Sequence, residues 1–139
     1  MKIPVLADSA TALALLQRAT AGLLYMTESD EPFVPVMGPG DRQTIGPEDA
    51  RALIGRAPGE GIAELSTADF FAEPAKRQDW HGPTEKLVVE CYRALQSIFE
   101  DQLADAKVFR LGEVRIDVLI MGKTADGHWV GLRTLAVET

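Results

Sequence analysis

The sequence predicts an α+β fold in which a mostly antiparallel sheet is covered by helices, and three observations lead to this class. Apolar residues alternate along 114–121, as they do in a β-strand. Asp126-Gly127, a strong signal for a hairpin turn, separates that stretch from a second extended stretch at 128–137. Residues 83–104 carry apolar side chains at helical spacing. The strands are therefore grouped, and two amphipathic helices are large enough to cover both faces of the sheet.

The first predicted helix begins at Asp8 or Ser9 and ends near Ala21. Asp and Ser are favoured N-cap residues, and Gly22 is a favoured stop. The apolar stripe that would lie on the sheet consists of Leu13, Leu15, Leu16 and Ala19. Because this apolar patch is short and follows a cap, we interpret it as a structural helix and not as a signal peptide.

The segment after this helix changes character twice. Residues 23–26 are apolar, whereas residues 27–32 are acidic and end in a proline, which predicts an exposed loop. Residues 33–37 predict a strand. Because Pro35 has no N–H donor, that strand belongs at a sheet edge or carries a bulge.

Residues 38–66 show the weakest pattern in the chain. Pro47 marks the start of one short helix, which carries the apolar residues at 52–54. Ser66 or Thr67 caps a second short helix, and Pro74 ends it.

The longest predicted helix runs from Pro83 to about Ala104, and residues 105–107 form a loop into the final sheet. Its apolar stripe consists of Leu87, Val88, Cys91, Leu95, Ile98, Phe99 and Leu103. Cys91 falls on this stripe, so we expect a buried and unreactive thiol.

Residues 108–139 form the sheet around which the chain is organised. A short apolar run at 108–111 leads to Gly112 and the alternating strand. One face of that strand carries Val114, Ile116, Val118 and Ile120, and the other carries Arg115, Asp117, Leu119 and Met121. The pattern predicts a half-buried strand. The next strand runs from about His128 to Val137 and leads directly to Thr139, where we expect the function to lie.

Length and composition indicate a single domain spanning residues 1–139, large enough to bury one core. The longest apolar runs are only a few residues, too short for a membrane-spanning helix. Cys91 is the only cysteine, which excludes an internal disulfide and leads us to expect a cytoplasmic protein.

The formal net charge of −7 argues against direct binding of nucleic acid, because the phosphates would be repelled and no basic stripe is present. Two interpretations of this charge remain. It is either a solubility feature alone or a complement to a basic partner, such as the substrate cleft of an enzyme that binds nucleic acid.

The sequence contains no recognisable catalytic or metal-binding motif. His81 and His128 have no cysteine partner at metal-ligand spacing, and no glycine pair opens a lysine-bearing phosphate loop. A catalytic grouping of Cys91, His81 and Asp79 is conceivable, but Cys91 falls on an apolar helical stripe. We therefore expect no enzymatic activity, no cofactor and no metal of its own.

The loop at 77–83 contains an informative tryptophan, Trp80. It lies between a helix that a proline ends and a helix that a proline starts. Two interpretations are open: the ring folds back as a lid on the core, or it is exposed as an anchor for a partner. Tryptophan is enriched among the residues that dominate protein interfaces.

Three blocks together resemble the nuclease A inhibitor family, and the match is collinear over nearly the whole chain. The blocks are Gly22–Ser29 followed by Glu31–Phe33; Gln78-Asp79-Trp80; and Val108–Val114 continuing through Asp117-Val118 and Gly122 to Val137-Glu138-Thr139, while Phe70-Phe71 also matches in place.

The resemblance implies a three-layer α/β/α sandwich similar to that of the plant pathogenesis-related group 1 proteins. It also implies that the chain, monomeric when free, tightly inhibits a sugar-nonspecific DNA/RNA endonuclease with a metal-dependent active site. In the family, the first-block glutamate meets arginines around the nuclease cleft, the second block supplies binding hot spots, and the terminal threonine reaches the catalytic magnesium. The matching residues are Glu28; Gln78, Asp79 and Trp80; and Thr139.

These roles make physical sense, because a nuclease cleft is built to hold phosphate with arginines and a hydrated magnesium ion. The Glu28 carboxylate matches an arginine fork, and a terminal carboxylate is an anion at neutral pH. The sequence departs from the family at residues 38–69 and at Lys76-Arg77, whose charges would oppose an arginine-lined cleft. The alternative functions are a binding module of the same fold with a different protein partner, and a small-molecule enzyme with a pocket around His81 and Cys91.

Overall fold

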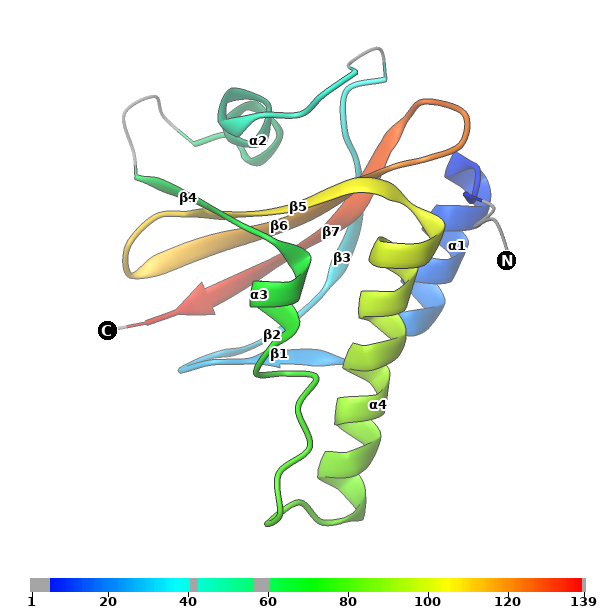
Figure 1. The fold of residues 1–139 in the computed structure, drawn as a ribbon. Helices are drawn as coiled ribbons and strands as arrows, with labels where there is room; N and C mark the ends of the chain where they lie inside the picture. Colours follow the sequence, from blue (N-terminus) through cyan, green and yellow to red (C-terminus); the bar gives the residue numbers. More distant parts are fainter. Residues whose placement is uncertain (1–5, 41–42, 57–60, 139) are drawn as a thin grey trace.

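The computed structural model describes residues 6–40, 43–56 and 61–138, and within these ranges it contains four α-helices, one π-helical segment and seven strands (Figure 1). In chain order they are α1 (Ser9–Ala19), β1 (Leu24–Met26), β2 (Asp30–Pro32), β3 (Val34–Met37), α2 (Pro47–Ile54), β4 (Ile62–Leu65), α3 (Thr67–Phe71), α4 (Pro83–Ser97), η1 (Ile98–Gln102), β5 (Ala104–Leu111), β6 (Arg115–Lys123) and β7 (Trp129–Val137). The prediction of an α+β fold is confirmed.

Five of the strands form one antiparallel sheet with the order β3-β7-β6-β5-β4, and β1 pairs only with β2. The predicted hairpin around Asp126-Gly127 joins β6 to β7 in a continuous register that pairs Arg115 with Val137 and Lys123 with Trp129. β3, which contains Pro35, lies at the sheet edge as predicted. The sheet centre therefore consists of the strands with the clearest sequence pattern.

The alternation along β6 assigns its side chains to the correct faces. Ile116, Val118 and Ile120 belong to the larger hydrophobic cluster, whereas Leu119 and Met121 belong to the smaller one. The expectation of a half-buried strand is wrong, because seven consecutive residues from Ile116 to Gly122 are buried. The second face is covered by α2 and its flanking segment, which contribute Ile45 and Ala50 to the smaller cluster.

The two long helices lie on the same face of the sheet and not on opposite faces. Leu16 of α1 and Leu95 of α4 are both fully buried in the larger cluster. Figure 1 shows α1, α3 and α4 on one side of the five-stranded sheet and the short helix α2 on the other. The predicted short helix at 47–54 thus has the covering role that was expected of a longer one.

The C-terminal part of the predicted stripe, Leu95, Ile98, Phe99 and Leu103, is buried as expected, but nearer the start of α4 a different row faces the core. Val89, Tyr92 and Leu95 are buried, whereas Leu87 is 68% exposed and Cys91 is exposed. The expectation of a buried thiol is therefore wrong. α4 itself ends at Ser97, but the chain remains helical through η1 to Gln102, close to the predicted end near Ala104. β5 includes the segment 105–107, which was expected to be a loop.

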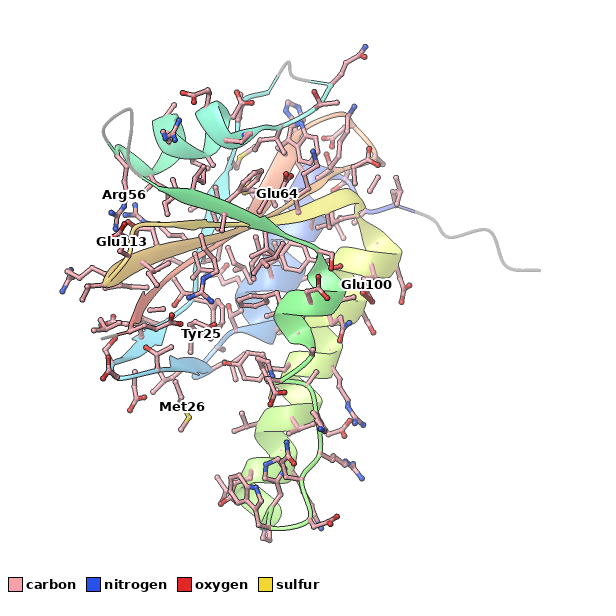
Figure 2. The ribbon with its side chains drawn as sticks, turned by 60° about the vertical axis from the view of Figure 1, so that its left-hand side comes forward. Tyr25, Met26, Arg56, Glu64, Glu100 and Glu113 are labelled. Carbon is pink, nitrogen blue, oxygen red and sulfur yellow. The ribbon has the colours of Figure 1, made fainter. Side chains whose placement is uncertain are left out.

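An arginine–aspartate cluster joins α2 to the sheet. Asp117 of β6 is 8% exposed and accepts hydrogen bonds from Arg56 Nε at 2.9 Å and from Arg133 Nη2 at 3.1 Å. Arg56 follows α2 and also donates to the Arg115 carbonyl at 2.6 Å. Figure 2 shows Arg56 beside Glu113 in the turn between β5 and β6. A carboxylate on the sheet thereby fixes the chain that leaves the covering helix.

Candidate functional site

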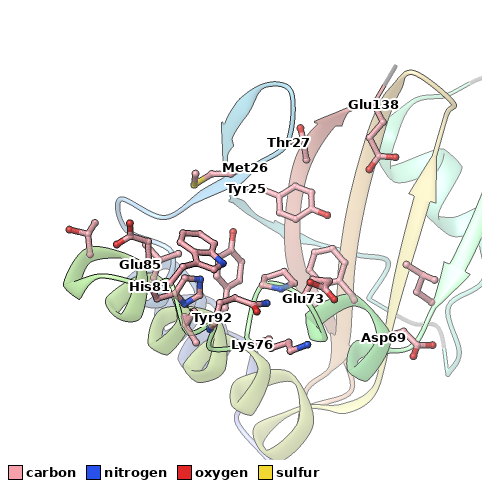
Figure 3. A pocket seen from close by; sticks show the side chains of 18 of the residues that line it. Tyr25, Met26, Thr27, Asp69, Glu73, Lys76, His81, Glu85, Tyr92 and Glu138 are labelled. Carbon is pink, nitrogen blue, oxygen red and sulfur yellow. Dashed lines mark hydrogen bonds between the residues drawn. The ribbon is translucent and has the colours of Figure 1, made fainter.

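A groove of about 790 Å³ runs along the side of the domain that carries α3 and α4 (Figure 3). One wall consists of the β1–β2 hairpin and the end of β7, and the other consists of α3, the α3–α4 connection and the N-terminal half of α4. Its described lining residues include Tyr25, Met26, Thr27, Phe70, Gln78, Trp80, His81, Tyr92, Arg110 and Glu138. These residues come from all three of the sequence blocks and from the two helices.

The acidic segment at 27–32 is the tip and second strand of a hairpin, not simply a loop, and it is attached to the end of the sheet. Val137 donates its N–H to Thr27 Oγ1 at 3.0 Å, and its carbonyl accepts the N–H of Glu28 at 3.2 Å. Thr27 Oγ1 also donates to the Ser29 carbonyl at 3.1 Å. Glu28 is exposed and lies beside the last residues of β7. The structure therefore brings the first block and the third block together.

The end of β7 is fixed to neighbouring strands. Glu138 donates its N–H to the Val114 carbonyl at 2.9 Å, and its Oε1 lies 2.6 Å from Arg110 Nη2. Arg110 is on β5 and its side chain is 23% exposed. Thr139 lies outside the described residues. The residue that precedes it, however, is restrained by its backbone and by its side chain.

Trp80 lies in a turn that is held by two hydrogen bonds between His81 and Gln78. His81 donates its N–H to the Gln78 carbonyl at 3.1 Å, and its Nδ1 accepts the N–H of Gln78 at 3.1 Å. The Trp80 and His81 ring centroids are 4.4 Å apart, with the rings nearly perpendicular. Trp80 is 73% exposed, so the interpretation of this ring as a lid on the core is wrong. An exposed, locally ordered tryptophan has the properties of an interface anchor.

The floor of the groove is aromatic. The centroid of Tyr25 lies 5.5 Å from that of Phe70 and 5.9 Å from that of Phe33, and Phe33 packs edge-on against Tyr92. The Tyr92 hydroxyl donates to the Leu24 carbonyl at 2.7 Å, and burial raises the pKa of this phenol well above its usual range. Burial is also the main cause of a raised pKa for Tyr25, although the Arg110 charge opposes the shift. Both phenols are therefore neutral near pH 7.

Four of the five predicted site residues lie in the described part of the chain, and they differ in how they relate to this groove. Gln78 and Trp80 line it directly, whereas Asp79 is exposed in the same turn but is not a lining residue. Glu28 follows the lining residue Thr27, and Thr139 follows the lining residue Glu138.

Sequence reasoning missed Tyr25 and Arg110 and considered His81 only as part of an enzyme, although each of the three lies inside or directly beside one of the three blocks. Those blocks were therefore the available signal. The residues were overlooked because each one supports or orders the site from within a turn, strand or aromatic cluster, which only the folded chain reveals.

The two positive charges before the tryptophan turn differ in their surroundings. Arg77 Nη2 lies 2.8 Å from Glu90 Oε1 on α4, an exposed carboxylate that it shares with Arg93, and Arg77 is not a lining residue of the groove. Lys76 instead lines the groove. The expected opposition to a basic partner therefore comes mainly from Lys76.

The described residues give little support to a catalytic site. Cys91 does not line the groove, so it is not grouped there with His81. Within the described ranges, no three or more His, Cys, Asp or Glu side chains are placed so that they could hold a metal ion. No helix in those ranges is long and apolar enough to cross a membrane.

The sequence model of a known protein family, described as nuclease A inhibitor-like protein, matches residues 10–139. The chain belongs to the nuclease A inhibitor-like family. The match covers α1 almost completely, the whole sheet and all three blocks around the groove. No curated protein sequence matches the chain. Membership in this family is consistent with a protein that binds another protein rather than a substrate.

Proposed function

We propose that this protein binds and blocks the active site of a sugar-nonspecific, metal-dependent DNA/RNA endonuclease. The observation that carries the proposal is that the three blocks typical of the family surround one groove, with Glu28 attached to the end of β7 and Trp80 exposed. A continuous surface of this kind suits a protein partner. It offers the Glu28 carboxylate beside the strand end that leads to Thr139, with the apolar anchor Trp80 in the same region.

In the proposed complex, each group replaces part of the nucleic acid. Glu28 accepts hydrogen bonds from arginines that otherwise hold phosphate, and Trp80 fills apolar area beside them. Thr139 offers hard oxygen ligands to the nuclease's magnesium ion, in keeping with the preference of that ion. No group in this surface contains a phosphodiester, so the nuclease has no bond to cut.

Four further properties that we expect belong to the same proposal. They are the three-layer α/β/α sandwich, its likeness to plant pathogenesis-related group 1 proteins, a monomeric free state and residence in the cytoplasm. In that compartment the inhibitor protects the nucleic acids of the cell that makes it.

Removal of Thr139 and replacement of Glu28 by Ala are the direct tests. Each change should weaken inhibition of a purified sugar-nonspecific endonuclease at least about tenfold, since interface hot spots typically cost more than 1.4 kcal/mol each. Asp101→Ala, which removes an exposed carboxylate in η1, is the matched control and should inhibit like the wild type.

Three outcomes separate the functions under consideration. Unchanged inhibition after loss of Thr139 would rule out the magnesium contact. A wild-type protein that does not affect the nuclease, yet retains a specific protein partner, would favour the alternative of a binding module, to which Lys76 in the groove points. Turnover of a small molecule bound around His81 would support an enzyme.

A further inference from the structure

The contacts that the three blocks imply involve only Gln78 and Trp80 among the lining residues of the groove and leave the rest of the lining without a role. We propose that the groove receives a basic segment of the bound nuclease. A Lys or Arg side chain of that segment lies along the aromatic floor and contacts the carboxylates on the wall formed by α3, the α3–α4 connection and α4. This inference rests on the proposed function. It adds a contact region that is distinct from Glu28 and Thr139.

The first argument is the charge of the groove. Asp69, Glu73 and Glu85 are exposed lining residues, and in the described part of the chain none of them forms an ion pair. The lining cations are Lys76 and Arg110, and Arg110 is already paired with Glu138 at 2.6 Å. Three carboxylates thus face one uncompensated ammonium group, so the groove favours a cationic occupant.

The second argument is the chemistry of the floor and rim. The ring centroids of Tyr25 and Phe70 lie 5.5 Å apart, and the Tyr92 hydroxyl already donates a hydrogen bond to the Leu24 carbonyl. The apolar rim residues Met26 and Trp80 are 69% and 73% exposed. Aromatic faces attract ammonium and guanidinium groups, and the long side chains of Lys and Arg have apolar stems that can cover such a surface.

The third argument is the position of the groove relative to the proposed interface. It begins at the turn that holds Trp80 and ends at Glu138, next to the strand end to which Glu28 is attached (Figure 3). A protein that contacts Glu28 and Trp80 together must therefore cover the groove. Because the groove lining carries three carboxylates without an ion-pair partner in the described part of the chain, a basic segment of the partner is the occupant with matching chemistry.

The decisive experiment measures binding of a purified sugar-nonspecific endonuclease by titration calorimetry at low and high salt. Glu73→Lys should weaken binding about tenfold at low salt, because it places a cation against the basic segment. The loss of affinity relative to the wild type should be smaller at high salt, since exposed charges are then screened. Asp101→Lys makes the same charge change outside the groove and should bind within about twofold of the wild type.

Lys76→Ala provides a test of opposite sign. Removal of the one uncompensated lining cation should tighten binding about two- to threefold, which corresponds to roughly 0.5 kcal/mol for an exposed charge. A gain of affinity does not arise from damage to the fold. Thermal unfolding of each variant serves as the folding control, and Glu73→Gln, with about threefold weaker binding expected, replaces Glu73→Lys if the latter unfolds.

The outcomes distinguish this inference from the function on which it rests. One outcome overturns the groove inference and leaves the proposed function intact. In that outcome the wild-type protein binds the nuclease, Glu73→Lys and Asp101→Lys lose the same amount of affinity, and Lys76→Ala gains none. Failure of the wild-type protein to bind the nuclease overturns both. Weaker binding by Glu73→Lys together with tighter binding by Lys76→Ala supports both.

Discussion

At the scale of single residues, His81 is the group that orders the turn carrying the exposed Trp80 side chain. Its backbone and its ring both bond to Gln78, and the ring also packs against Trp80. A tryptophan that is ordered before binding loses less conformational entropy in the complex than one on a mobile loop. In the proposed complex, the imidazole would therefore strengthen binding without touching the partner.

His81→Ala should therefore weaken inhibition several-fold while leaving the fold intact. The loss of ordering affects one side chain, which corresponds to about 0.5–1.5 kcal/mol of binding free energy. Nitrogen relaxation of the Trp80 indole should show increased motion in the variant, and the melting temperature should stay the same. A rigid indole combined with weaker inhibition would mean that the imidazole contacts the partner directly.

At the scale of elements, the sequence predicts strands better than helix orientation. Two-residue periodicity has only two faces, so Leu119 and Met121 were assigned correctly to the side opposite Ile120. Helix α4 carries apolar residues over a wide arc, and both the row of Leu87 and Cys91 and the row of Val89 and Tyr92 fit a helical stripe. Only the neighbours, here α1 and α3, decide which row is buried.

The start of α1 is joined to the β6–β7 turn through Asp126, and this junction makes stability depend on pH. Asp126 accepts hydrogen bonds from Ser9 N at 3.0 Å, from Ser9 Oγ at 2.8 Å and from Thr124 Oγ1. The hydrogen bond from Thr124 is the largest cause of a lowered pKa for the Asp126 carboxyl, whose ordinary value is 3.8. The ionised form therefore stabilises the fold above about pH 4, and this contribution is lost as the pH falls through the lower folded-state value.

Asp126→Asn should be less stable than the wild type at pH 7, and the difference should narrow as the pH falls below about 4. Denaturant titrations from pH 7 to pH 2 measure this difference. Asp101→Asn is the control, because its side chain is exposed and makes no hydrogen bond in the described part of the chain. A difference that stays constant with pH would show that ionised Asp126 does not stabilise the junction.

At the scale of the whole molecule, the central sheet depends on close approach of β6 and β7. A Cβ at Gly131 would meet the Ile120 carbonyl oxygen and would lie 2.7 Å from Met121 Sδ. Because β6 is buried on both faces, neither strand has room to move away. The centre of the sheet is therefore the part of the fold that tolerates least change.

Gly131→Ala should lower the free energy of unfolding by at least about 1–3 kcal/mol, the usual cost of overpacking a core. Gly61→Ala is the matched control, since a Cβ at that position has no neighbour within 4 Å, and a change below about 0.5 kcal/mol is expected. Urea titration measures both values. Equal stability of the two variants would mean that the strands can separate to accept the methyl group.

The sequence also predicted the site unevenly at this scale. Glu28 and Trp80 are predictions from local blocks, because a family motif is local by nature. The groove was not predicted, since Tyr25, Glu73 and Arg110 are far apart in the chain and become neighbours only when the hairpin, α3 and β5 fold onto one another. β4 was also missed, because its four residues gain their strand conformation from pairing with β5.

The contrast between the two tryptophans has a practical optical consequence. Trp129 is fully buried in the smaller cluster, whereas Trp80 is 73% exposed beside the groove. An indole in an apolar core emits at shorter wavelength than one in water and is shielded from acrylamide. The red side of the intrinsic emission therefore reports the surroundings of Trp80, where the proposed partner would bind, and the blue side reports the integrity of the core. The unlabelled protein thus carries a separate signal for each event.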